Sequence, residues 1–236
     1  MAVSIDDVYQ KVLSLANKEQ RGYITPQEFN LIANKAQREI YNSYFHQLKM
    51  AYWKQKNQMG VAFDNIEMIQ EKLHPFKIST TFTQEANDAT YQLPEALYSI
   101  DVILKSGVEI TEMSKKEIAY TEKHPLTKAT NDRMIYVREN MANGYPVITL
   151  YPTPTTETTY DIHYYKEPSK PKWAYVVVNE NALYNTNLST NFELHVSEEE
   201  NIVTRILQLA GVITKNADVV QSALMDKANT KQEENN

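Results

Sequence analysis

Apolar side chains recur every three or four residues in the first quarter of the chain, as they do on one face of a helix. The pattern predicts three helices there, over residues 4–20, 25–56 and 63–73. The second start is the best marked, because Thr25 and Glu28 form a capping box around a proline at the first helical position. We expect this second helix to run for roughly 30 residues, on the order of 45 Å, and to act as a scaffold.

The apolar arc of the second predicted helix widens towards its end, where several large aromatic side chains occur. These aromatic residues are Tyr41, Phe45, Tyr52 and Trp53. Two interpretations stay open. The aromatic side chains either form a contact surface beyond the helical bundle or cover the β part of the same chain.

From residue 76 the pattern changes to alternation of apolar and polar positions, which predicts half-buried strands. The predicted strands cover residues 76–82, 91–93, 102–104, 108–110, 134–138, 147–151, 160–164, 176–178 and 192–196. Ser106-Gly107 and Asn143-Gly144 have the composition of turns between paired strands. One short helix is expected over residues 115–122. We expect the strand at 176–178 to pair with that at 192–196 across the polar loop 179–191.

The C-terminal segment returns to helical spacing. Ser197 and Glu200 predict a capped helix start, and Gly211 predicts its end. A second helix is expected to begin near Asn216, and an all-polar tail follows over residues 227–236. The fold class that follows is α+β. Residues 1–75 and 197–226 form a helical bundle built from both chain ends, and residues 76–196 form an inserted antiparallel β domain with long loops.

Composition narrows the function classes. The chain of 236 residues has 24 basic and 30 acidic residues and a net charge of −6, which argues against binding nucleic acid by neutralising phosphates. Cysteine is absent, which excludes disulfides, thiolate catalysis and zinc sites based on cysteine. No apolar run approaches the ~18 residues of a membrane span, and no signal peptide is recognisable. We therefore expect a soluble protein without membrane contacts.

Motifs of catalysis and cofactor binding are missing from the sequence, so we expect no enzyme activity and no cofactor. The five glycines form neither a phosphate-binding loop nor a Gly-x-Ser-x-Gly elbow. The five histidines never fall at helical metal-ligand spacing. His163 and Asp161 alternate on one predicted strand and could present two ligands, although solvated strand residues have the same spacing. Lys170 and Lys172 beside Trp173 could contact a phosphate backbone, although two lysines are a weak signal in an acidic protein.

Two runs of carboxylates have a structural explanation already. Asp6-Asp7 and Glu198-Glu199-Glu200 occur where the first turns of helices favour negative charge.

Several segments together resemble the head-to-tail connector proteins of short-tailed bacteriophages, which are also called adaptor, ring or tail tubular proteins. The composition, rich in Asn, Lys and Ile, suggests a phage of the crAss-like kind. The similar segments are Ser4 to Tyr9, Tyr23 to Asn30, Ile148 to Pro154, Tyr164 to Pro168 with Trp173, and the closing helix pair. The resemblance spans most of the chain, and its motifs are structural rather than catalytic.

The resemblance implies a structural virion protein at the head-to-tail junction, assembled in the host cytoplasm. It implies a homo-oligomeric ring, a dodecamer in this family, that joins the portal protein to the next tail or ring protein. DNA would pass through its channel without sequence-specific binding. Another neck or tail component, such as a stopper or completion protein, is the alternative, and a small hydrolase is a more remote one. The portal-docking residues would be those of the polar tail: Lys227, Lys231, Gln232, Glu233, Glu234, Asn235 and Asn236.

Overall fold

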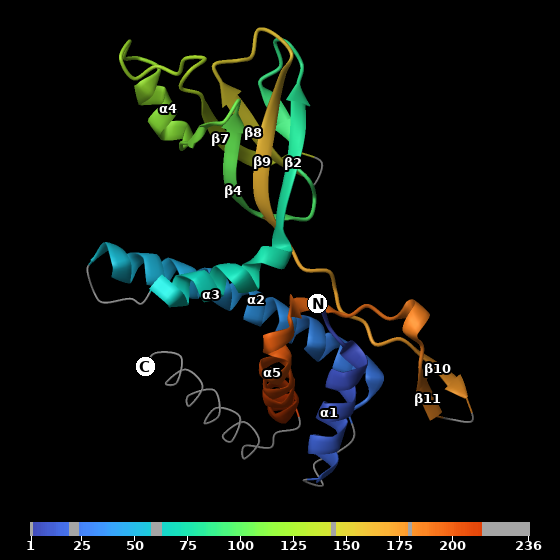
Figure 1. The fold of residues 1–236 in the computed structure, drawn as a ribbon. Coiled ribbons are helices and arrows are strands. Elements are labelled where there is room, and N and C mark those ends of the chain that lie inside the picture. Colours follow the sequence, from blue (N-terminus) through green and yellow to red (C-terminus); the bar gives the residue numbers. More distant parts are fainter. Residues whose placement is uncertain (1, 19–23, 58–62, 143–144, 179–180, 214–236) are drawn as a thin grey trace. The chain divides into compact units, whose positions relative to one another are not determined.

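The computed structural model describes residues 2–18, 24–57, 63–142, 145–178 and 181–213. They form two compact units, shown in Figure 1. The helical unit consists of the described parts of residues 1–75 and 168–213, and the β unit is Phe76–Glu167. Helices and antiparallel strands are both abundant, so the predicted α+β class is confirmed.

The three predicted N-terminal helices are present as α1, α2 and α3, with the bounds Ile5–Lys18, Pro26–Lys56 and Phe63–Leu73. The Thr25 side chain accepts a hydrogen bond from the Glu28 N–H, and the Glu28 carboxylate accepts from the Thr25 N–H, which completes the predicted capping box. Of the apolar residues that recur at helical spacing in α1, Ile5, Val8 and Val12 are buried, whereas Leu15 is 43% exposed.

The C-terminal helix α5 (Glu199–Ile213) packs against α1 and α2, as expected for a bundle built from both chain ends. Its start differs from the prediction. A 3-10 turn at Val196–Glu198 precedes the α-helix, and the imidazole of His195 accepts from the Ser197 N–H. Its end also differs, because the helix continues through Gly211. Gly211 is buried, and packing of the helix face outweighs the ~1 kcal/mol that glycine costs in a helix.

The predicted pairing of residues 176–178 with 192–196 is wrong. Strand β10 (Tyr175–Val178) pairs with β11 (Asn181–Tyr184), which immediately follows it. Strand β12 (Phe192–His195) pairs instead with β1 (Ala2–Val3) at the start of the chain. Both pairs belong to the helical unit. The β unit therefore ends at Glu167, whereas the predicted insertion extended to residue 196.

The β unit is built from two four-stranded sheets that share one apolar core. The strand orders are β2-β9-β4-β5 and β3-β8-β7-β6. The bounds are β2 Lys77–Gln84, β3 Thr90–Gln92, β4 Leu97–Lys105, β5 Val108–Glu109, β6 Thr111–Glu112, β7 Ile135–Ala142, β8 Tyr145–Tyr151 and β9 Thr158–Lys166. Phe82 and Tyr160 from the first sheet pack in one cluster with Ile148 and Leu150 from the second. The alternation read from the sequence thus corresponds to inward and outward faces.

The second sheet is also covered on its other face. The short helix α4 (Lys115–Thr121) contributes Ile118 to a separate cluster with Ile135 and Val137 of β7. The predicted turn at Ser106-Gly107 joins β4 to β5, and both residues have positive φ, +49° and +81°. Two successive residues with positive φ are typical of a type I′ hairpin turn.

The capping box of α2 leads to a prediction about pH. The N–H and the hydroxyl of Thr25 both donate to the Glu28 carboxylate and lower the pKa of Glu28. Ionised Glu28 therefore stabilises the folded state above the pKa of an unfolded glutamate, and this contribution is lost as the pH falls through the lowered folded pKa.

We expect Thr25→Ala to raise the pKa of Glu28 towards its ordinary value and to lower the free energy of unfolding by about 1 kcal/mol. NMR titration of the Glu28 carboxyl measures the first effect, and urea unfolding at neutral pH measures the second. Thr25→Ser, which keeps the hydroxyl, is the control and is expected to change both much less. An unchanged Glu28 pKa in Thr25→Ala would contradict the assignment.

Candidate functional site

Trp173 fixes the returning chain on the helical unit. Its backbone N–H donates to the side-chain oxygen of Asn30 at 2.7 Å, and its carbonyl accepts from the amide nitrogen of Asn30 at 3.0 Å. The indole Nε1–H donates to Asp6 at 2.9 Å, and the ring lies 4.2 Å, between centroids, from that of Tyr9. Trp173 is buried, so its indole is a structural element of the helical unit.

A second polar anchor lies two turns further along α2. Gln37 is fully buried, and its amide bridges two parts of the returning chain. Its Nε2 donates to the Ser169 carbonyl at 2.7 Å, and its Oε1 accepts from the Glu193 N–H at 3.2 Å. The Glu193 carboxylate accepts in turn from the Ser169 N–H at 3.0 Å. Residues 169 and 193 are thereby held together on α2, with the segment between them extending away.

That segment carries the β10–β11 hairpin. Tyr175 and Tyr184, which pair across the two strands, both stack on Trp173 with ring centroids 5.8 Å away. The anchored indole therefore sets the position of the hairpin base. No sequence signal pointed to this arrangement, because Trp173 and its partner Asp6 are far apart in the chain.

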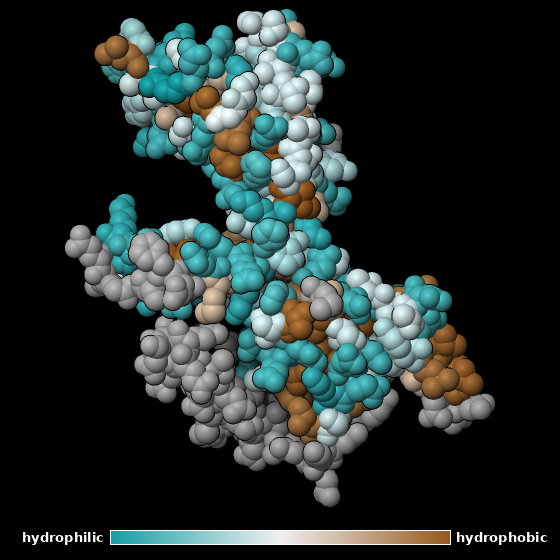
Figure 2. Space-filling view, viewed as in Figure 1, coloured by the Kyte–Doolittle hydropathy of each residue, from teal (hydrophilic) through white to brown (hydrophobic). Residues whose placement is uncertain are grey.

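The hairpin exposes apolar side chains to an unusual degree. Val176, Val177, Val178 and Leu183 are 48%, 63%, 45% and 53% exposed. Figure 2 shows them as a hydrophobic patch at β10 and β11. Scattered single apolar residues are ordinary on a protein surface, whereas a contiguous patch marks a site of interaction. The hairpin is therefore the candidate site for contact with another protein.

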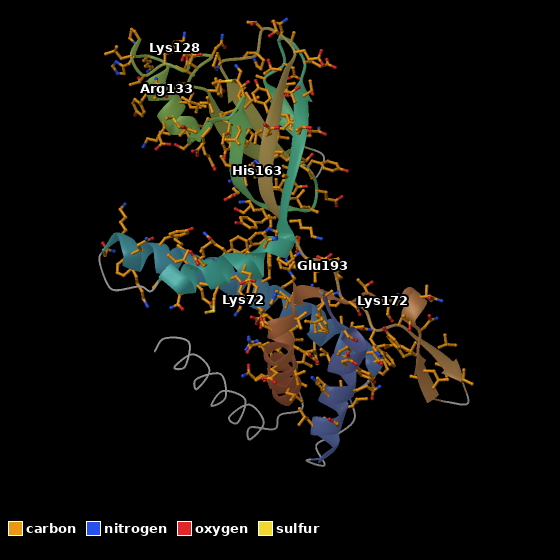
Figure 3. The ribbon with its side chains drawn as sticks, viewed as in Figure 1. Lys72, Lys128, Arg133, His163, Lys172 and Glu193 are labelled. Carbon is orange, nitrogen blue, oxygen red and sulfur yellow. The ribbon has the colours of Figure 1, made fainter. Side chains whose placement is uncertain are left out.

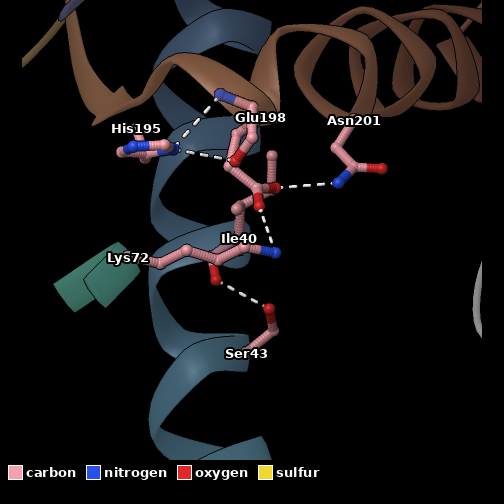
Figure 4. Close-up of polar contacts among 7 residues, drawn as sticks. Ile40, Ser43, Lys72, His195, Glu198 and Asn201 are labelled. Atoms are coloured by element: carbon pink, nitrogen blue, oxygen red, sulfur yellow. Dashed lines mark hydrogen bonds and ion pairs between the residues drawn. The ribbon is translucent and has the colours of Figure 1, made fainter. Parts of the chain in front are cut away.

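A buried ion pair ties α3 to the start of α5. Lys72 Nζ lies 2.8 Å from Glu198 Oε1, and Glu198 Oε2 accepts from Asn201 Nδ2 at 2.8 Å (Figure 4). The Glu198 side chain is only 3% exposed. The sequence explained Glu198 as a helix first-turn carboxylate. In the structure it also fixes a contact between two elements.

The β unit has a polar cluster of its own. Glu112 on β6 accepts from Tyr136 Oη at 3.0 Å and from Arg138 Nη2 at 2.9 Å. Burial, chiefly, raises the pKa of Tyr136 to about 12, and the Glu112 charge adds to the effect. Its phenol thus stays protonated at neutral pH and serves as a hydrogen-bond donor rather than as a base.

His163 and Asp161 lie on the face of β9 opposite the shared core, with His163 labelled in Figure 3. Their strand neighbours bring no further ligand. His163 is opposite Ser79 and Val102, and Asp161 is opposite Thr81 and Leu104. Among the described residues, no group of three or more His, Cys, Asp or Glu side chains could hold a metal ion.

The other predicted site residues are dispersed. Lys170 and Lys172 are exposed beside the anchored Trp173 (Figure 3 labels Lys172). Of the carboxylate runs, Asp6 accepts from Trp173 and Glu199 pairs with Lys11 at 2.6 Å. The predicted helix near residue 216 and the portal-docking residues of the tail, 227–236, lie outside the described residues.

Within the part of the chain that the structure describes, no helix combines the length and the apolar character that a membrane span needs.

These features are typical of structural proteins, which act through their contacts with other proteins. The long-range polar contacts of the described residues hold elements of the chain together. The most distinctive described surface is an apolar hairpin. The model of the SU10 adaptor protein family matches residues 6–196. The chain belongs to this family, and it is a structural adaptor protein of a bacteriophage. The search of curated proteins finds no match.

The Lys72–Glu198 pair allows a test of how α3 is held. Lys72→Met leaves a buried carboxylate without its cation and is expected to lower the free energy of unfolding by about 3 kcal/mol. In Glu198→Gln the Lys72 side chain loses its partner, but it is 23% exposed and can be solvated by water. The free energy of unfolding is therefore expected to fall by only about 1 kcal/mol. Urea unfolding followed by tryptophan fluorescence measures both, because Trp53 and Trp173 both belong to the helical unit.

The more exposed pair Lys11 and Glu199, 2.6 Å apart in the same unit, gives the matched control. Lys11→Met is expected to change stability much less than Lys72→Met, because water screens an exposed ion pair. Equal costs for Lys72→Met and Glu198→Gln would contradict the asymmetry that burial predicts.

Proposed function

We propose that this adaptor forms a closed ring that joins the portal vertex of the capsid to the tail of a short-tailed phage. Portal protein binds one side of the ring, and the next tail or ring protein binds the other. The observation that carries the proposal is the family match over residues 6–196, which includes the β unit and the helical unit up to the residues before α5. The family relation also supports a location at the head-to-tail junction.

The proposed ring leaves a channel through which DNA passes without sequence-specific binding. The net charge of −6 supports this part, because an acidic lumen repels phosphates and lets the genome slide instead of adhering. The sequence similarity described above favours a dodecamer and a phage of the crAss-like kind.

Two separately folded units suit a protein with two neighbours. Each unit has its own core, so contacts made by one leave the packing of the other intact. In the proposed assembly the helical unit supplies the bundle around the channel, and the β unit supplies surface for the tail side or the outside of the ring.

Imaging of intact particles by electron cryo-microscopy, without imposed symmetry, tests the ring directly. We expect density for this chain in a closed ring under the portal, in twelve copies. A single copy or a plug across the channel would favour a stopper or completion protein instead. Density elsewhere in the particle would overturn the proposal.

We also propose that the polar tail, residues 227–236, docks into the portal. Deleting the tail is expected to abolish portal binding in a pull-down assay and to leave the thermal unfolding transition nearly unchanged, because nine of its ten residues are polar or charged and the tenth is Ala228. A variant with the same ten residues in scrambled order keeps the charge and the length. Its loss of binding would show that sequence matters, and undiminished binding by the deletion variant would rule out docking by the tail.

A further inference from the structure

We propose that the β10–β11 hairpin of one copy packs against the C-terminal end of α2 in the neighbouring copy, as a head-to-tail contact around the ring. The inference rests on the proposed ring and names the surfaces that close it. It is carried by three observations on the helical unit: a hairpin without cover, a second apolar patch, and their separation along α2.

Both faces of the hairpin expose apolar side chains. Val176 pairs with Leu183 and shares a face with Val178, while Val177 and Ala182 lie on the face that bears Tyr175 and Tyr184. The tyrosines stack on Trp173, but the valines of both faces remain about half exposed. Among the described strands, β10 and β11 pair only with each other. A two-stranded sheet alone is marginal in water, so this one gains stability from a partner.

The residue types of the β10–β11 hairpin indicate what kind of surface would cover it. Neither strand of the hairpin contains a charged residue. Nucleic-acid phosphates would need cationic side chains, and these are missing from both strands. Valine and leucine side chains are covered instead by an apolar protein surface.

The helical unit has such a surface at the far end of α2. Met50 and Trp53, one turn apart on the same side of the helix, are 41% and 52% exposed. Tyr52 accepts a hydrogen bond from Gln70 of α3 at 2.8 Å, which fixes this end of α2 against its neighbour.

The two surfaces lie at opposite ends of one helix. The hairpin is anchored at Asn30, near the start of α2, through Trp173. Trp53 lies roughly 35 Å further along, at ~1.5 Å of rise per residue. Figure 1 shows the β10–β11 hairpin and the α3 end of α2 on opposite sides of the helical unit. One chain cannot bring its own two patches into contact. The hairpin of one copy can, however, reach the end of α2 in the next copy around the ring.

The area available also favours a ring over an isolated pair. The exposed apolar side chains of the hairpin are few, whereas a stable interface needs ~800 Å² per partner. A single contact through the hairpin is therefore too small to hold two copies together by itself. A heterologous contact that closes gives every copy two such interfaces, and closure raises the effective concentration of each contact.

Cross-linking tests the contact, and the chain suits it because it has no cysteine. The variant carrying both Leu183→Cys and Met50→Cys would be assembled into particles and treated with a short bifunctional thiol reagent. We expect a ladder of covalent multimers up to the full ring on a denaturing gel. Each single variant, treated alike, is expected to stay monomeric. Dimers from a single variant would indicate a two-fold contact and overturn the inference.

Charge substitution gives a second measurement. Val177→Asp is expected to reduce the yield of particles with a complete ring at least about tenfold, because the contact would bury an unpaired carboxylate. Leu126→Asp is the matched control, since Leu126 is 92% exposed in the β unit and its replacement is expected to leave the yield unchanged. Circular dichroism of the purified full chains checks that both variants fold. A normal yield for folded Val177→Asp would overturn the inference.

The inference and the proposed function can fail separately. If imaging shows the ring but no ladder forms, and the hairpin faces solvent, the portal or the distal tail protein, the inference is wrong and the function stands. If imaging shows no ring, the proposed function fails and the inference fails with it.

Discussion

The helical unit depends on the way that Trp173 is held between α1 and α2. The chain leaves this unit at residue 75, builds the β unit, and returns at residue 168, so the two parts of the helical unit must be joined by contacts rather than by sequence. Trp173 joins them. Its backbone forms two hydrogen bonds with Asn30, and its indole donates to Asp6 and packs on Tyr9. A buried tryptophan supplies a large apolar surface, and its N–H must find an acceptor, which Asp6 provides.

Polar contacts around Trp173 fix the position of the buried segments relative to one another. Gln37 is inaccessible to water, so the carbonyl and the NH2 of its side-chain amide must both be paired inside the protein. Both pair with the backbone of the returning chain. An apolar side chain at this position would fill the same space without fixing the register of residues 169 and 193. The buried Glu198 acts in the same way just before α5, where its ion pair with Lys72 of α3 and the hydrogen bond that it accepts from Asn201 of α5 fix the placement of these two helices.

The prediction from sequence succeeded where the determinants are local. The capping box at Thr25 and Glu28 and the turn at Ser106-Gly107 each depend on a few neighbouring residues, and both are confirmed. It failed where distant segments compete. Residues 192–196 looked like the partner of 176–178, but β1, nearly two hundred residues away, takes that place. Gly211 has the local character of a helix end, and the tertiary packing of α5 overrides it.

The candidate site was predictable only in part, for the same reason. Trp53 was noted as a member of an aromatic arc, and one of its two interpretations was a contact surface. The sequence pattern does not show the hairpin, because it predicts that residues 176–178 pair with 192–196 rather than with β11. Exposure is a property of the folded unit: Val176 to Val178 would be ordinary core residues in a wider sheet. Here the anchored Trp173 covers only the base of the hairpin. An uncovered, uncharged pair of strand edges favours unwanted association, and proteins usually protect such edges. An adaptor can retain such a pair of strands where a defined partner covers it, and in the proposed ring a neighbouring copy would do so.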